Sequence, residues 1–177
     1  MRTSALALAL AVVLLAACDS TTPSFPLPVS AGDVAFVTPV PGAIRTQGFG
    51  CTSFEREPVQ PECPGGHFHA GVDLGAPQAT PVLAAAGGLV TAVRWDPYGY
   101  GNYLVLDLGH GFTTLYAHLL ETDVQVGEPV FRAHQVGLLG SSGNSTGAHL
   151  HFEVRSGGRP VDPELFLPAA STRGGSP

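Results

Sequence analysis

The chain has 177 residues, enough for one folded domain with a short appendage, and 44% of them are hydrophobic, which is enough to form a core. Eight arginines and no lysine stand against fourteen acidic residues, so the formal net charge is −6. This balance argues against a nucleic-acid-binding protein, which normally presents a basic face. The 23 glycines and 16 prolines favour turns and short strands over long helices.

Residues 1–17 predict a signal peptide. Arg2 supplies a positive charge, and the apolar run from Ala5 to Ala17 is shorter than the roughly 20 residues of a membrane-spanning helix. The following "LAAC", which ends at Cys18, resembles the lipobox of bacterial lipoproteins, in which the chain is cut before a cysteine that is then acylated. We therefore expect lipidation of Cys18 and a stable anchor on the extracytoplasmic side of a membrane. The alternative is an ordinary signal peptide cut near Ala17, with Cys18 incidental.

The rest of the chain divides by composition. Residues 18–32 are rich in Ser, Thr and Pro and are typical of an extended tether. Residues 33–168 carry the regular patterns of a single folded domain, and residues 169–177 are expected to form a flexible C-terminal tail.

Short β-branched or aromatic stretches separated by Gly, Pro, Asn or Asp dominate the predicted domain. No stretch keeps a 3.6-residue apolar period. The sequence therefore predicts an all-β fold, a single, mostly antiparallel sandwich or barrel-like domain. The expected strands are residues 33–37, 43–49, 80–86, 88–95, 102–108, 112–119, 135–140 and 148–155.

Cys51 and Cys63 form an even pair in a chain expected to reach an oxidising compartment. We predict a disulfide between them that closes a short loop and stabilises the fold by about 3 kcal/mol. The rival is a metal site made of both cysteines with His67 and His69. Structural zinc motifs space their cysteines two to four residues apart, and this pair is much further apart, so the disulfide is preferred.

The stretch "GAHLHFEV" (147–154) alternates apolar residues with His149, His151 and Glu153, as a strand with two unlike faces does. Both imidazoles then lie on one face, where two cations would repel each other. A metal ion removes this difficulty because neutral imidazoles can share it. His69 and Asp73, four residues apart in a glycine-containing loop, supply further donors. The pattern indicates a His₂Asp zinc site with one position left open for water.

Three motifs in this order carry a family resemblance. "HAGVD" (69–73), "LYAHL" (115–119) and "STGAHLHFEV" (145–154) are similar to the signatures of the lysostaphin/LytM-type zinc endopeptidases, which cleave peptide bonds of bacterial peptidoglycan. The order and the intervals match over roughly residues 43–167. The resemblance implies an antiparallel β domain with a surface groove that holds one zinc ion on its floor.

The resemblance also implies a role for each matching residue. His69, Asp73 and His151 correspond to the zinc ligands. His149 corresponds to a catalytic histidine beside the water, and we expect it to act as the main base, with His118 stabilising the charge that develops on the substrate oxygen. The two histidines could also share or exchange these duties.

Other polar residues keep simpler interpretations. His67 is a substitute ligand, a groove residue or neither, whereas His110 and His134 lie in turn-like contexts and are expected to be solvated. Glu153 either hydrogen-bonds a ligand histidine or is an ordinary strand residue. The acidic loop between the two cysteines is expected to border the groove and to influence which peptide fits.

These expectations predict a zinc-dependent endopeptidase acting on peptidoglycan stem peptides or cross-bridges, in the cell envelope and anchored to a membrane by lipid. Two alternatives remain open. One is a non-catalytic relative that binds the wall or activates peptidoglycan amidases, although such relatives typically lose zinc ligands. The other is a zinc hydrolase directed at glycine-rich secreted proteins.

Overall fold

The computed structural model describes residues 36–168. The predicted signal peptide (1–17), the lipidation site Cys18, the tether (18–32) and the tail (169–177) lie outside the described residues. Within residues 36–168, no helix is long and apolar enough to cross a membrane.

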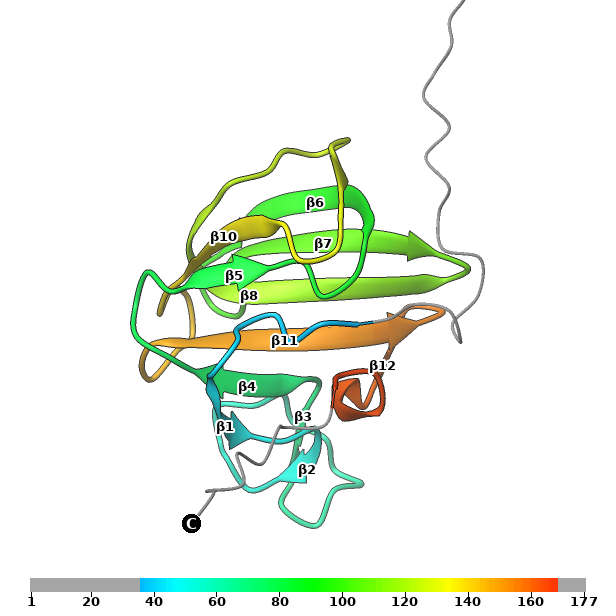
Figure 1. Ribbon diagram of the computed structural model, residues 1–177. Helices are drawn as coiled ribbons and strands as arrows, with labels where there is room; N and C mark the ends of the chain where they lie inside the picture. Colours follow the sequence, from blue (N-terminus) through cyan, green and yellow to red (C-terminus); the bar gives the residue numbers. More distant parts are fainter. Residues whose placement is uncertain (1–35, 169–177) are drawn as a thin grey trace, which may run out of the picture.

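The described residues form a ten-stranded sheet and a separate two-stranded hairpin (Figure 1). Every strand pairing among them is antiparallel. The main sheet runs in the order β1-β4-β11-β8-β7-β6-β9, while β12 pairs with β11, and β10 pairs with β5 and β8. The all-β, antiparallel prediction is confirmed. The strands are β1 (Ile44–Gln47), β2 (Gly50–Thr52), β3 (His67–His69), β4 (Val72–Gly75), β5 (Pro81–Leu83), β6 (Gly88–Asp96), β7 (Gly101–Gly109), β8 (Phe112–Thr122), β9 (Pro129–Val130), β10 (Gln135–Leu139), β11 (His149–Ser156) and β12 (Arg159–Val161), followed by the 3₁₀ turn η1 (Pro163–Leu165).

Seven of the eight predicted strands overlap an observed strand, and the first does not. Residues 36 and 37 are outside any strand, although the Val37 nitrogen donates to the Ala85 carbonyl at 2.8 Å. The sequence also did not predict β2, β3, β4, β9 or β12 as strands. Each has only two to four residues, too few for an alternating pattern to show.

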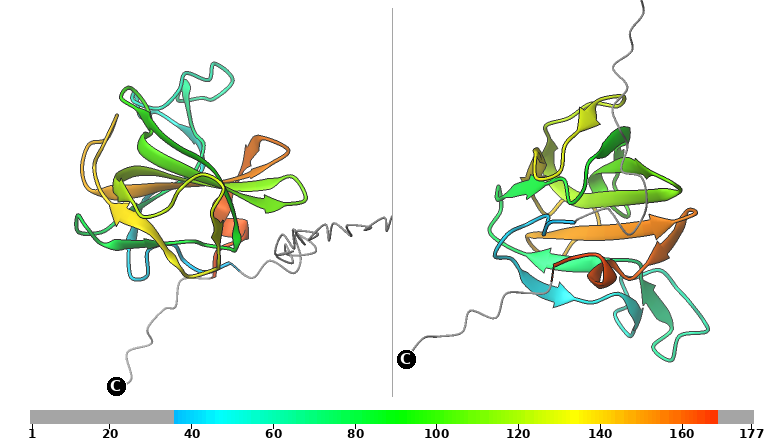
Figure 2. Two further views of the ribbon diagram at one scale, coloured as in Figure 1. Left: turned by 90° about the horizontal axis from the view of Figure 1, so that it is seen from above. Right: turned by 45° about the vertical axis from the view of Figure 1, so that its right-hand side comes forward.

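The core lies on one face of the sheet and the polar residues of β11 lie on the other. Leu150, Phe152 and Val154 are fully buried in the hydrophobic core. Because successive strand residues point to opposite faces, His149, His151 and Glu153 face away from it. Figure 2 (left) shows β5 and β10 on one side of the sheet and the β2–β3 hairpin on the opposite side. The hairpin therefore stands on the polar face.

A disulfide joins Cys51 and Cys63, with an S–S distance of 2.04 Å. The disulfide prediction is confirmed, and the rival cysteine–histidine metal site is wrong because the two sulfurs are bonded to each other. We call residues 51–63 the disulfide loop. This loop connects β2 to β3, and neither strand pairs with the main sheet. The disulfide therefore cross-links a segment that no strand of the main sheet holds in place.

Replacing both cysteines with alanine should loosen the disulfide loop before it affects the main sheet. The loop-entropy argument sets the total loss at about 3 kcal/mol, and the separate pairing of β2 with β3 confines most of it to the hairpin. Hydrogen exchange and limited proteolysis should show faster opening of residues 51–66 and little change in β7, β8 and β11. Equal destabilisation of all strands would contradict this local role.

Candidate active site

Three short strands bring His69, Asp73 and His151 together. β3 carries His69, and β4 pairs with β11 so that Asp73 lies directly opposite His151. One ligand atom from each residue lies within 4.8 Å of the others, and all three residues are buried. The His69 Nε2 and His151 Nδ1 atoms are 2.9 Å apart, and they lie 3.1 Å and 3.0 Å from Asp73 Oδ1.

The outer nitrogens of both rings determine which atoms face one another. His69 Nδ1 donates to the Gly48 carbonyl at 2.7 Å, because a carbonyl oxygen can only accept. His151 Nε2 donates to Glu153 Oε1 at 3.1 Å, because an ionised carboxylate can likewise only accept. When both rings are neutral, the inner nitrogens therefore direct lone pairs toward the Asp73 carboxylate. Three acceptor atoms then converge on one point, where a proton or a metal cation must lie between them.

This donor set suits zinc. Two imidazole nitrogens and one carboxylate are the ligands of catalytic zinc sites with an open fourth position. Zinc bonds of about 2.0 Å in a tetrahedron separate neighbouring ligand atoms by about 3.3 Å. The separations here, 2.9 to 3.1 Å, are close to that value.

The electrostatic field in the cluster favours positive charge. Burial raises the pKa of Asp73, but hydrogen bonds from His151 and His69 outweigh burial and hold it well below its usual range. Burial lowers the pKa of His151, yet the carboxylates of Asp73 and Glu153 raise it to about 9. The same field that stabilises a proton at the inner nitrogen of His151 also favours a metal cation there.

His118 and His149 lie beside this cluster with their rings 4.7 Å apart. Both are oriented by residues 141–148, which we call the serine loop: the His118 Nδ1 donates to the Ser142 carbonyl at 2.8 Å and the His149 Nδ1 to the Gly147 carbonyl at 2.9 Å. In both rings Nε2 is then the nitrogen that these carbonyls leave unused. The His149 Nε2 lies 3.7 Å from Asp73 Oδ2, so this nitrogen is next to the metal cluster.

The backbone of His118 is unusual for a strand residue. Its φ is +59°, a conformation that costs a residue with a side chain free energy and that is found often at functional sites. Burial, opposed by the hydrogen bond to Ser142, lowers the pKa of His118 to about 4. The ring is therefore neutral at physiological pH.

Glu153 is fully buried and hydrogen-bonded on both oxygens. Oε1 accepts from the Tyr100 hydroxyl at 2.6 Å as well as from His151, and Oε2 accepts from Arg155 Nε at 2.5 Å. Burial raises the pKa of Glu153, but the hydrogen bonds from His151 and Arg155 lower it to about 2. Of the two interpretations of Glu153, the structure supports hydrogen bonding to His151.

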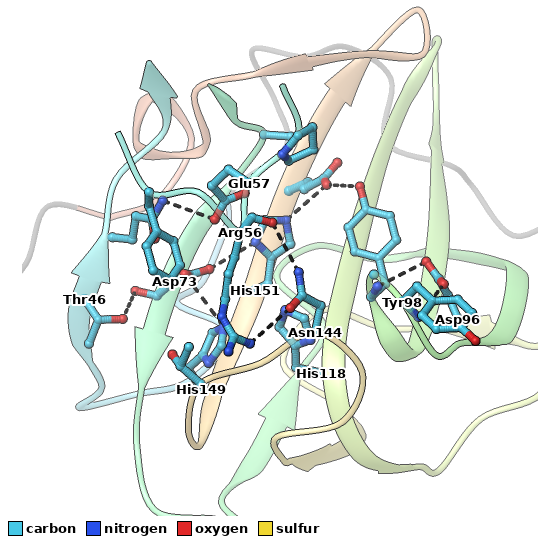
Figure 3. A pocket seen from close by; sticks show the side chains of 18 of the residues that line it. Thr46, Arg56, Glu57, Asp73, Asp96, Tyr98, His118, Asn144, His149 and His151 are labelled. Carbon is cyan, nitrogen blue, oxygen red and sulfur yellow. Dashed lines mark hydrogen bonds and ion pairs between the residues drawn. The ribbon is translucent and has the colours of Figure 1, made fainter. Parts of the chain in front are cut away.

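A groove of about 680 Å³ runs over the cluster. Its walls come from the disulfide loop, residues 96–100 and the serine loop (Figure 3). Gly143 brings two of these walls together: a Cβ there would lie 2.3 Å from the Gly101 nitrogen, and both glycines have positive φ. Gly143 is thus required for the close approach of the two backbone segments.

The structure separates the remaining histidines from the cluster. The His67 Nδ1 donates to the Glu57 carbonyl at 2.7 Å, and His67 contributes no atom to the His69–Asp73–His151 cluster. His110 and His134 are exposed next to turns, as expected. Sequence reasoning missed Tyr100 and Arg155, although Arg155 continues the same face of β11 as His151 and Glu153.

A Glu153→Gln substitution should weaken zinc binding by about tenfold to a hundredfold, the range for partners of metal-binding histidines. Arg155 can only donate, so it will hold the amide oxygen, and the amide NH₂ will face Tyr100 and His151. His151 Nε2 must then accept, and its proton moves to the inner nitrogen, where it competes with the metal.

Zinc affinity can be measured by competition with a chromophoric chelator, with thermal unfolding of the zinc-free protein as the measure of folding. Glu164→Gln is the matched control because Glu164 is exposed and pairs with Arg45, away from the cluster. Unchanged zinc affinity in Glu153→Gln would mean that Glu153 does not set the His151 tautomer.

Comparison with known proteins identifies relatives for this domain. The model of peptidase family M23 matches residues 67–163. The peptidoglycan DD-endopeptidase ShyA of Vibrio cholerae is 40% identical over 105 residues, which are 59% of this chain and 24% of that protein. The DD-carboxypeptidase/endopeptidase Mpg of Neisseria meningitidis serogroup B is 44% identical over 96 residues, 54% of this chain and 22% of that protein. The chain thus spans less than a quarter of the length of these relatives.

Solved structures agree with this assignment. A zinc-containing peptidase from Vibrio cholerae superposes with a TM-score of 0.62 at 37% identity, over 72% of this chain and 39% of that chain. The catalytic domain of lysostaphin from Staphylococcus simulans superposes with a TM-score of 0.59 at 32% identity, over 70% of this chain and 91% of that chain. With a family match over more than half of its residues and the convergent His–Asp–His cluster, the chain belongs to peptidase family M23.

Proposed function

We propose that this protein is a zinc-dependent endopeptidase that hydrolyses peptide cross-links of bacterial peptidoglycan. The observation that carries the proposal is the convergence of ligand atoms from His69, Asp73 and His151 beneath a groove that two further histidines also line. The names of the relatives from Vibrio and Neisseria support the substrate class. Such a substrate places the domain in the cell envelope, and the "LAAC" motif supports a lipid anchor at Cys18.

His69, Asp73 and His151 are the residues that would hold the zinc ion. When bound, zinc lowers the pKa of water and polarises a substrate carbonyl. The residues of the chain orient these ligands: the Gly48 carbonyl fixes the His69 ring, and Glu153 fixes the His151 ring.

His149 is the better placed of the two groove histidines to act as the base. Its Nε2 lies 3.7 Å from Asp73 Oδ2, so in the unprotonated form it can accept a proton from an attacking water and pass that proton to the leaving amine. His118 has its ring centroid 4.7 Å from that of His149, and its low pKa makes it a strong proton donor once protonated. With a proton taken from solvent, His118 would stabilise negative charge on the substrate oxygen through Nε2.

The test of function is digestion of purified peptidoglycan by the full-length protein, with mass spectrometry of the released fragments. Zinc-loaded protein should release cross-link fragments, a chelator should stop release, and added zinc should restore it. The new termini identify the bond. Binding of zinc and peptidoglycan without any release would instead support a wall-binding protein or an activator of amidases.

Single substitutions should separate metal binding from catalysis. His149→Ala and His118→Ala should retain one zinc per chain and lose activity by about 10²-fold to 10⁴-fold. Asp73→Ala should lose the zinc itself. His134→Ala, an exposed histidine outside the groove, is the control and should keep both. Metal analysis measures zinc content, and initial rates measure activity. Loss of zinc in His149→Ala would show that His149 is a metal ligand instead of a base.

A further inference from the structure

Arg56 is the one arginine among the residues that line the groove, and it has no carboxylate partner. Arg45 pairs with Glu164 and Arg155 with Glu153, whereas no ion pair joins Arg56 to a carboxylate among residues 36–168. Arg56 hydrogen-bonds only a neutral side chain, through Nη1 to Asn144 Oδ1 at 3.2 Å. Its positive charge is thus unmatched within the described part of the chain.

Asn144 holds Arg56 over the groove. The Asn144 amide donates to the Arg56 carbonyl at 3.2 Å, so side chain and backbone of Arg56 are both bound, and the Asn144 nitrogen donates to the Gly99 carbonyl at 2.9 Å. Figure 3 shows the Arg56 side chain extending toward Asn144, with His149 and His118 close by in the same view. The Cys51–Cys63 disulfide closes the loop that carries Arg56.

The acidic residues of the groove are already engaged elsewhere. Asp96 accepts from the backbone nitrogens of Tyr98 and Tyr100, and Glu57 accepts from the side chain of Gln47. Asp73 and Glu153 belong to the metal cluster and its support. No acid of the groove therefore neutralises Arg56, while Asn144 occupies one of the five N–H groups of the guanidinium.

We propose that Arg56 binds a carboxylate of the substrate and thereby selects an anionic peptide. This inference rests on the proposed endopeptidase function and specifies its substrate. A guanidinium forms paired hydrogen bonds with a carboxylate, and Arg56 is exposed on the wall of the groove, where a substrate can reach it. Cross-linked stem peptides carry free carboxylates close to the cross-link, whereas a polyglycine bridge carries none along its length. Arg56 favours the former.

The experiment compares two synthetic cross-linked peptides that differ only in whether the carboxylates nearest the cross-link are free or amidated. The full-length zinc-loaded protein should cleave the free acid with a kcat/KM about twofold to fivefold higher, the range for an ion pair at an exposed site. Arg56→Ala should remove this preference by slowing cleavage of the acid alone. Arg56→Lys should keep part of it, because lysine retains the charge without the paired geometry.

Two further variants isolate the role of the charge. Arg159→Ala removes an exposed arginine on β12, outside the groove, and should keep the full preference. Asn144→Ala removes the contacts that hold Arg56 but keeps the guanidinium, and should therefore reduce the preference for the free acid without abolishing it. Metal analysis should give one zinc per chain in every variant.

Several outcomes would overturn the proposal. Equal cleavage of both peptides by the wild-type protein, or equal loss on both peptides in Arg56→Ala, would show that Arg56 only supports the loop, while the endopeptidase function would stand. If zinc-loaded wild-type protein cleaves neither peptide nor peptidoglycan, the proposed function is wrong and the role of Arg56 falls with it.

Discussion

The antiparallel pairing of β11 with β4 on one side and β8 on the other is the constraint on which the site depends. The register sets His151 opposite Asp73 across one edge and opposite Ala117 across the other, next to His118. A slip of one residue would move every side chain of β11 to the other face. Fully buried Phe152 prevents such a slip, because it would enter the groove and leave a histidine in the core. Hydrophobic burial on one face thus fixes polar geometry on the other.

The burial of two carboxylates, Asp73 and Glu153, explains why so many hydrogen-bond donors surround the ligand residues. A buried carboxylate is costly unless it is hydrogen-bonded and paired. Glu153 meets this requirement within the protein, through Arg155, Tyr100 and His151. Asp73 faces two rings whose inner nitrogens are acceptors when neutral, so its charge is balanced either by a proton on these rings or by a metal cation between them. A zinc ion bound by the three residues would fill that role.

The sequence predicted the parts of the site that follow from strand periodicity. Alternation in "GAHLHFEV" predicted that His149, His151 and Glu153 lie on one face of a strand. In the structure they do, with Leu150, Phe152 and Val154 in the core on the other face. The sequence could not predict that the Arg56 and Asn144 side chains meet, because these residues are 88 positions apart and both lie in loops. Nor could it show the positive φ of His118, since "LYAHL" reads as regular alternation. Periodicity specifies the faces of strands, whereas loop contacts depend on the assembled fold.

The serine loop links substrate contact to catalytic geometry. Its carbonyl oxygens at Ser142 and Gly147 fix both groove histidines, and its Asn144 fixes Arg56. A group that binds Arg56 through N–H groups not used by Asn144 leaves this contact intact, so it adds affinity without moving the histidines. A group that displaces Asn144 would instead release the loop and the histidines it orients. The geometry therefore favours a substrate whose carboxylate approaches the side of the guanidinium that Asn144 does not contact. Binding of such a peptide leaves the serine loop, and with it His149, in position for catalysis.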